Sequence, residues 1–289
     1  MFSRSFWREN AKDLGFWGMD TILFFIKNFF THKDFLPPSN ELPGTLFTPL
    51  HFAVAGVLLA LTIVLGLFVA KKDEKIIRRV FLFVWAFLTV WETVKIVWET
   101  YAGKEVSFES AGILPLYPCS IFLYAMPLCI WGNSLLRYMG CGYVCSLGLL
   151  GGAINFFYPA NVLNNYSCIS FAGFHTLIFH ASIVFCVIVM LKSGYHSYKK
   201  ATKAWHLLLP AVPALAVSIV ANIVNFSPID SDYMFFKLES FFFSPIGNAT
   251  PDWFSVVLVY FIYLIIHSLP YLPFYFKNKK KAMAVVVEV

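Results

Sequence analysis

The sequence predicts an all-α protein, a polytopic bundle of transmembrane helices with seven spans, its N-terminus outside and its C-terminus in the cytoplasm. Of the 289 residues, 59% are hydrophobic and only 13% are charged, and the mean hydropathy is +0.70. A water-soluble fold of this size has no means of burying so much apolar surface, so lipid must be the solvent. Apolar runs of about 20 residues also recur along the chain, which is the length that a helix needs to cross a bilayer.

Seven segments meet this length criterion. In chain order they are residues 50–70, 80–101, 113–132, 137–158, 169–191, 205–226 and 253–275. The connections are short except for 227–252, whose serine, proline, aspartate and phenylalanine content predicts an ordered surface loop with aromatic anchors. We therefore expect an extracytoplasmic N-terminal segment at 1–49, a membrane bundle at 50–276 and a cytoplasmic basic tail at 277–289.

The N-terminal segment predicts an interfacial helix. Residues 14–30 are apolar but too short for a span, and Asp20 and Lys27 interrupt them. Such a segment fits the outer membrane surface. We expect no removable signal peptide, because no apolar run precedes residue 14 and no small-residue cleavage pattern follows.

Orientation follows from the lysines and arginines, which cytoplasmic loops retain. Every second connection is basic. The basic sets are Lys71, Lys72, Lys75, Arg78 and Arg79, then Arg137, then Lys192, Lys199, Lys200 and Lys203, and finally Lys277, Lys279, Lys280 and Lys281. This alternation indicates a multi-pass protein of the cell membrane. It also accounts for the net charge of +6, so nucleic-acid binding is not expected.

Charged side chains inside a span are costly unless paired or hydrated, and each is a functional candidate. In the second segment Glu92, Lys95 and Glu99 are spaced three and four residues apart, which places them on one helical face. One interpretation is a Glu-Lys-Glu ladder that holds the bundle together. The other is a polar pocket around Glu92 and Lys95 that binds substrate.

The third segment contains a candidate nucleophile, Cys119. Pro115 and Pro118 lack amide protons and disrupt the helical turn before it. Irregular backbone in a membrane must face protein or water, so we expect Cys119 to face a cavity. A single membrane cysteine is more often a small hydrophobe, and a nucleophilic role requires a partner.

The partner is expected in the fifth segment, where His175 and His180 lie five residues apart. That spacing is about 140° around a helix, so only one of them is expected to meet Cys119. Asn222 and Asn225 lie near the outer end of the sixth segment, and we expect them to bind substrate together with Glu92, Lys95 and Tyr117. These polar groups all converge on the outer half of the membrane, whereas His267 lies toward the cytoplasm and is interpreted as structural.

The order of several motifs resembles the YwaF-like family of integral membrane proteins. The matching stretches are LPLYPCSIF at 114–122, FHTLIFHASIVF at 174–185, IVN at 223–225 with DYMFF at 232–236, and the pair Pro251 and Trp253. The family includes an animal transmembrane acyltransferase that acts on ether phospholipids. The resemblance implies a phospholipid or lysophospholipid substrate, Cys119 as the acyl-accepting nucleophile and a span-five histidine as its partner. His180 fits the pattern of more distantly similar membrane lipid hydrolases better than His175 does.

One position departs from the family pattern. Bacterial relatives often have histidine two residues before the cysteine, and this chain has Tyr117 there. If that histidine assists the chemistry, this chain is either inactive or depends on its span-five histidine. Acyl transfer through a thioester needs a thiolate, a base and donors for the oxyanion. Cys119, His180 and either Asn222 or Lys95 are the candidates for these roles, and no cofactor or metal is expected.

The first hypothesis is therefore an acyltransferase or lipid hydrolase that acts on phospholipid acyl chains through a Cys119 thioester, assisted by a span-five histidine. Two other hypotheses remain open. Intramembrane charge pairs and proline-broken helices also occur in transporters, so a small-solute transporter or substrate-binding subunit using the Glu92 and Lys95 pocket is the main alternative. Thiol-disulfide chemistry between Cys119 and Cys168 is weaker, because the chain has no C-x-x-C motif.

Overall fold

The computed structural model describes residues 23, 26–104, 114–227, 232–237 and 251–287, and this part of the chain is helical and contains no strand. The longer helices are α3 (Pro49–Val69), α4 (Glu74–Ala102), α5 (Phe122–Trp131), α6 (Ser134–Tyr143), α7 (Leu149–Phe157), α9 (Phe171–Lys192), α11 (Val212–Asn225), α13 (Asp252–Ser268) and α14 (Leu272–Val287). Short helices are η1 (Lys33–Phe35), η2 (Ser39–Glu41), the π-helical turn η3 (Val144–Gly148), α8 (Ala160–Leu163), η4 (Tyr198–Lys200), α10 (Trp205–Leu208), η5 (Leu209–Ala211) and η6 (Tyr233–Phe235). The predicted fold class is confirmed.

Capping residues set where several of these helices begin. Thr48, Asp73 and Ser170 each accept a hydrogen bond from an amide in the first turn of α3, α4 and α9. Pro49 follows Thr48 in the first turn of α3, where backbone amides have no acceptor within the helix. Proline, which lacks an amide proton, therefore costs no helical hydrogen bond there. These local signals explain why the predicted starts at 50 and 169 agree closely with the observed ones.

Five helical segments are long and apolar enough to cross a membrane. They are Pro49–Val69, Glu74–Ala102, Ser134–Leu163, Phe171–Lys192 and Trp205–Asn225, and α13 with α14 makes a sixth if that pair, bent by 60°, counts as one span. Pro270 lies in the bend, where it cannot continue the helical hydrogen bonding. Seven full spans are therefore not confirmed, and the orientation stays a prediction.

The predicted third span, 113–132, differs most from the structure. Only Phe122–Trp131 is helical, and residues 114–121 form successive turns instead. The two prolines in that stretch remove amide donors, as expected from the sequence. The predicted interfacial helix at 14–30 lies mostly outside the described residues.

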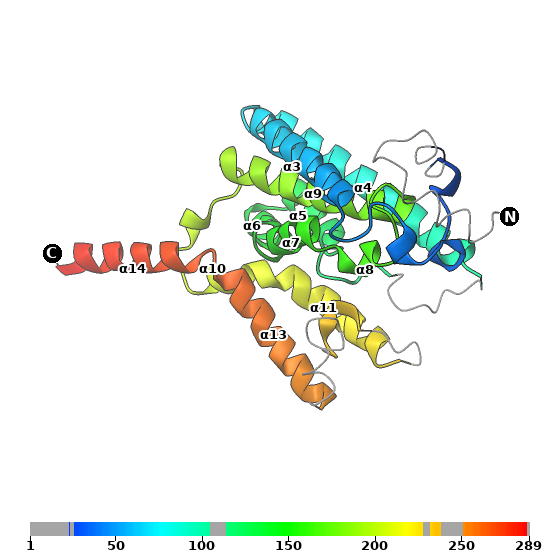
Figure 1. Cartoon of the computed structure of the whole chain (residues 1–289). Helices are drawn as coiled ribbons and strands as arrows, with labels where there is room; N and C mark the ends of the chain where they lie inside the picture. The colour runs from blue at the N-terminus through cyan, green and yellow to red at the C-terminus, as the bar shows by residue number, and fades with distance from the viewer. Residues whose placement is uncertain (1–22, 24–25, 105–113, 228–231, 238–250, 288–289) are drawn as a thin grey trace.

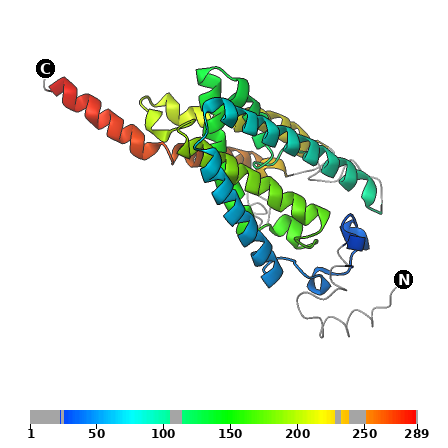
Figure 2. The ribbon, with the colours of Figure 1, turned by 90° about the horizontal axis from the view of Figure 1, so that it is seen from above.

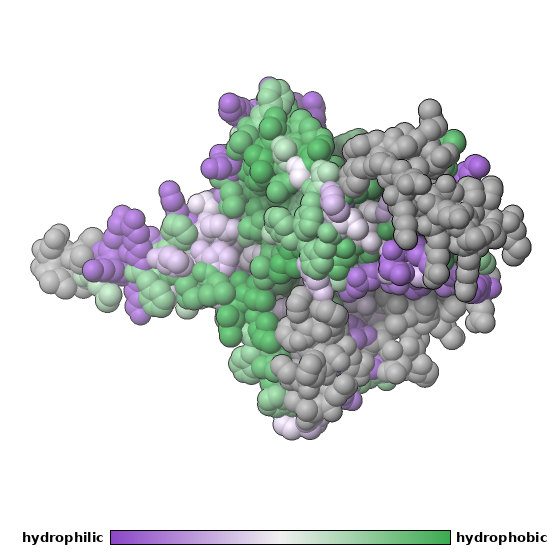
Figure 3. Space-filling view, in the orientation of Figure 1, coloured by the Kyte–Doolittle hydropathy of each residue, from purple (hydrophilic) through white to green (hydrophobic). Residues whose placement is uncertain are grey.

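Helix α9 lies at the centre of the bundle, against α3, α4 and α7, and Figures 1 and 2 show this arrangement from two directions. Most side chains of α9 are buried, whereas α3 exposes large apolar side chains such as Val57, Val64 and Phe68. Figure 3 shows apolar surface over the middle of the visible face and hydrophilic residues near the α3–α4 turn and along α14. This distribution is the one expected of a protein whose solvent is lipid.

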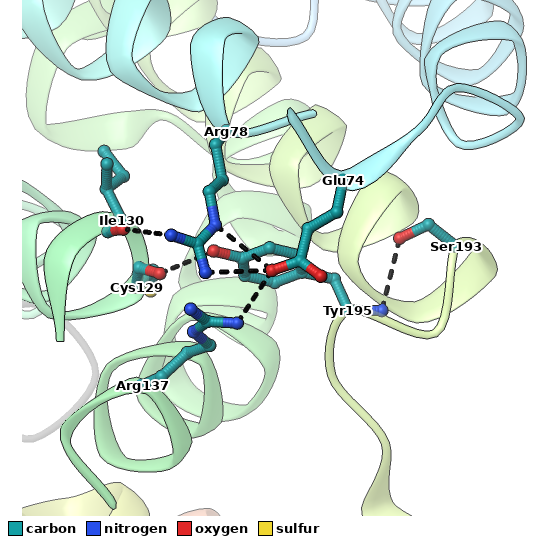
Figure 4. Close-up of polar contacts among 7 residues, drawn as sticks. All are labelled: Glu74, Arg78, Cys129, Ile130, Arg137, Ser193 and Tyr195. Carbon is teal, nitrogen blue, oxygen red and sulfur yellow. Dashed lines mark hydrogen bonds and ion pairs between the residues drawn. The ribbon is translucent and has the colours of Figure 1, made fainter. Parts of the chain in front are cut away.

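An ion cluster joins α4 to α6 at the end of the bundle where the basic connections lie (Figure 4). One Glu74 oxygen accepts hydrogen bonds from Arg78, at 3.1 and 2.9 Å, and from Arg137, at 2.9 Å. The Arg137 guanidinium also stacks on Tyr195, whose hydroxyl donates to the carbonyl of Cys129. Arg78 and Arg137, which the sequence presented as topology signals, therefore also tie helix ends together.

Candidate functional site

Glu92 is the centre of the buried polar cluster. Its side chain projects from α4, and the residue is only 4% exposed. Its Oε1 lies 3.2 Å from Nζ of Lys95 on the same helix, and its Oε2 lies 3.0 Å from Nε2 of His175 on α9. A carboxylate buried in a membrane protein needs such partners, because an unpaired charge there costs several kcal/mol.

The His175 ring is held by aromatic neighbours on both helices. It stacks on Trp91 with the rings 6° from parallel and their centroids 6.3 Å apart, and on Phe179 at 5.8 Å. Its Nε2 lies 3.0 Å from the carboxylate of Glu92. The ring is therefore positioned by stacking and by the close approach of this carboxylate.

His180 presents a different environment on the same helix. Its Nδ1 lies 2.7 Å from the carbonyl oxygen of Thr176. A carbonyl only accepts hydrogen bonds, so Nδ1 carries the proton and Nε2 keeps a free lone pair. That Nε2 is buried and has no hydrogen-bond partner among the described residues. His180 thus has the electronic state of a general base, although no contact joins it to Glu92.

Cys119 lies in the turns that precede α5 and is half-buried. Pro115 and Leu123, four residues before and after it in the chain, line a groove together with Glu92. The carbonyl of Pro118 accepts a hydrogen bond from Tyr143, and the amide of Leu114 donates to the hydroxyl of Tyr233 at 2.9 Å. The turn that leads into Cys119 is therefore anchored to distant parts of the chain at two points before the cysteine.

A groove of about 400 Å³ separates α4 from the segment 115–127. Its lining residues are Trp85, Thr89, Glu92, Thr93, Ile96, Pro115, Leu123, Tyr124 and Pro127. The groove opens to the outside of the bundle, because Thr93 and Tyr124 at its rim are exposed. Val90 and Val94, which neighbour it on α4, are exposed too and face lipid in a membrane. The carboxylate of Glu92 thus borders a largely apolar groove that opens sideways.

The remaining predicted residues form a second group around Tyr233. Both polar atoms of the Asn225 side chain bind the backbone of Tyr233, at 2.8 Å and 2.7 Å. The ring of Tyr117 packs against Tyr233 and Phe235, with centroids 5.1 and 5.8 Å away. Asn222 donates to the hydroxyl of Tyr260 on α13 at 3.2 Å. The structure thus connects Asn225 and Tyr117 to η6, and Asn222 to α13.

We expect Asn225→Ala to lower the free energy of unfolding by about 2–3 kcal/mol, because it removes two hydrogen bonds from a buried backbone segment. Asn222→Ala is the matched control, with one hydrogen bond lost and an expected cost of about 1 kcal/mol or less. Chemical denaturation in detergent micelles measures both. Equal effects of the two substitutions would contradict the role given to Asn225.

The charge ladder predicted along α4 is not formed as a continuous series. Lys95 pairs with Glu92, whereas Glu99 lies 3.5 Å from His32 of the N-terminal segment. His32 also contacts Asp34 at 3.1 Å. Glu99 therefore helps to hold the N-terminal segment on α4, and Glu92 with Lys95 forms a separate pair.

Sequence reasoning missed several residues of the site. Trp85 and Thr89 follow the helical spacing that leads to Glu92, so the 3.6-residue period was a usable signal for them. Tyr143 had no such signal, since it lies within an apolar span far from Cys119 in the chain. Among the described residues, no three His, Cys, Asp or Glu side chains are grouped so as to hold a metal ion.

The comparisons with known proteins agree with a membrane protein of this architecture. A model of the TMEM164 family, a transmembrane protein family, matches residues 46–277. The match covers α3 through the start of α14 and so includes every site residue described above. No curated protein and no solved structure matches the chain.

Proposed function

The chain belongs to the TMEM164 family, and from that premise we propose that it is a membrane-embedded acyltransferase that moves acyl chains between phospholipids through a thioester on Cys119. The observation that carries the proposal is the buried cluster of Glu92, His175 and Lys95, whose Glu92 lines the same groove as Pro115 and Leu123, the residues four before and four after Cys119 in the chain. A carboxylate, an imidazole and a thiol are the groups that cysteine-dependent acyl transfer requires.

In the first half of the reaction the histidine takes the thiol proton and the thiolate attacks the ester carbonyl. The C–S bond forms, the acyl C–O bond breaks, and the histidine gives the proton to the departing oxygen, so that the lysophospholipid leaves as an alcohol. In the second half the hydroxyl of another lysophospholipid gives its proton to the histidine and attacks the thioester. A new C–O bond forms, the C–S bond breaks, and the departing thiolate takes the proton back from the histidine.

The contacts suggest a division of roles. His175 is the better supported base, because Glu92 holds it and favours its protonated form during the reaction. His180 is the alternative base, because its Nε2 is free. The Lys95 ammonium, which is paired with Glu92, is the better supported candidate for stabilising the oxyanion, because the amide of Asn222 is bound to Tyr260 on α13.

The test is capture of the thioester on Cys119. We expect wild-type protein, incubated with phospholipid vesicles and quenched in acid, to gain one acyl chain in intact mass, and hydroxylamine to remove it. Cys119→Ala should lose both the adduct and acyl transfer measured by lipid mass spectrometry. Cys168→Ala is the matched control, since Cys168 is fully buried elsewhere in the chain. Comparing His175→Ala with His180→Ala identifies the base.

Acyl transfer that persists in Cys119→Ala would overturn the proposal. The transporter hypothesis makes the opposite prediction. Solute uptake into proteoliposomes that survives Cys119→Ala and is lost in Glu92→Gln would favour transport instead.

A further inference from the structure

The groove beside Glu92 has the dimensions of a single acyl chain. Its α4 wall runs from Trp85 to Ile96, and a rise of 1.5 Å per residue makes this wall about 16 Å long. The hydrocarbon core of a bilayer is about 30 Å thick, so one leaflet contributes about 15 Å. The groove is therefore about as long as one leaflet is thick.

Trp85 closes one end of this groove. Its indole Nε1 donates to the carbonyl of Leu123 on the opposite wall at 2.9 Å, so the ring bridges α4 and α5. The ring also packs edge-on against Trp131, with centroids 5.3 Å apart. A side chain held on two sides in this way cannot swing aside to admit a longer chain without losing both contacts.

Ile96 and Pro115 line the other end of the groove, and Glu92 lines the wall between the two ends. Cys119 lies between Pro115 and Leu123 in the chain. An acyl chain whose carboxyl group enters at the Ile96 end has its methyl end toward Trp85.

We propose that Trp85 sets the acyl-chain length that the protein accepts, by closing the far end of the groove against the methyl end of the chain. The proposal rests on the proposed acyl transfer for its consequence, but lipid occupancy of the groove can be measured without it. The occupant to which we commit is the acyl chain of a membrane phospholipid, because the groove is apolar, opens toward lipid and matches one leaflet in length.

The first experiment locates the chain. Phosphatidylcholine vesicles carry a diazirine either next to the acyl carboxyl group or at the terminal carbon, and the labelled peptides are mapped by mass spectrometry. We expect the terminal probe to label the Trp85 and Leu123 peptides and the proximal probe to label the Ile96 end. The Cys119→Ala protein should show the same pattern, so that loss of chemistry is distinguishable from loss of binding.

The second experiment measures length preference as competition between tetradecanoyl and octadecanoyl phosphatidylcholine for photolabelling. Trp85→Ala should shift the preference toward the longer chain by about tenfold. This value is the lower limit of the discrimination that a tight apolar pocket achieves for a single methylene group. Trp85→Phe, which keeps most of the ring but loses the hydrogen bond, should shift it less. Trp253→Ala is the control, because Trp253 is 69% exposed on α13.

Labelling by the terminal probe away from Trp85 and Leu123 would overturn the proposal even if acyl transfer is found. An unchanged length preference in folded Trp85→Ala would do the same. If Trp85→Ala does not fold, the wild-type labelling pattern and the Trp85→Phe preference still decide the question.

Discussion

Glu92→Gln is expected to lower acyl transfer by about 10²- to 10⁴-fold, which is the usual contribution of general acid–base catalysis. The amide retains the shape of the carboxylate but carries no charge to hold His175, which lies 3.0 Å away, or Lys95, at 3.2 Å. Glu92→Ala is expected to lower the free energy of unfolding as well, by about 3–5 kcal/mol, because it leaves two cationic or basic groups without their buried partner. Lipid mass spectrometry and denaturation in detergent measure the two effects.

Glu99→Gln is the matched control for this prediction. Glu99 lies on the same helix and also contacts a histidine, His32, but its side chain is 22% exposed and the contact is longer, at 3.5 Å. Because this pair is longer and less buried than the pair of Glu92 with His175, we expect little change in activity and a smaller loss of stability than in Glu92→Ala. Equal activity in Glu92→Gln and Glu99→Gln would contradict a role for the buried cluster of Glu92, His175 and Lys95 in the proposed mechanism.

Gly173→Ala is expected to prevent folding or to cost more than the roughly 1–3 kcal/mol typical of overpacking. A Cβ at this position would lie 2.0 Å from the carbonyl oxygen of Ser167 and 2.8 Å from the Cα of Cys168. Both contacts are with backbone, so no side-chain rotation relieves them. The substitution would push the start of α9 away from the preceding loop and displace His175 two residues later. Yield of monodisperse protein and the thermal unfolding midpoint report the effect.

Gly151→Ala is the control, since nothing lies within 4 Å of a Cβ at that helical position. Alanine in a helix interior is favoured over glycine by about 0.5–1 kcal/mol, so we expect Gly151→Ala to be neutral or slightly stabilising. Wild-type stability in Gly173→Ala would show that α9 does not pack closely against the 167–168 backbone.

The residues of the candidate site were predictable to different degrees. Glu92 and Lys95 were found from the sequence because charges in an apolar run are conspicuous and their spacing places them on one face. The break around Cys119 was also predictable, because the two prolines act locally on the backbone. Asn225 was expected in a substrate pocket, but its side chain is used by the backbone of Tyr233. That partner lies in another element, and the spacing within α11 carries no information about it.

The sequence by itself determined that this protein is a helical membrane protein and where most of its long helices lie, because apolar run length, capping residues and prolines act over a few neighbouring residues. Only the tertiary structure decided that Glu92 meets His175, that Trp85 bridges α4 and α5 beside the groove, and that the third predicted span is a short helix preceded by a series of turns. Those outcomes depend on how far each helix is rotated and shifted against its neighbours. Packing between distant segments sets that rotation and shift, so a local sequence pattern does not predict them.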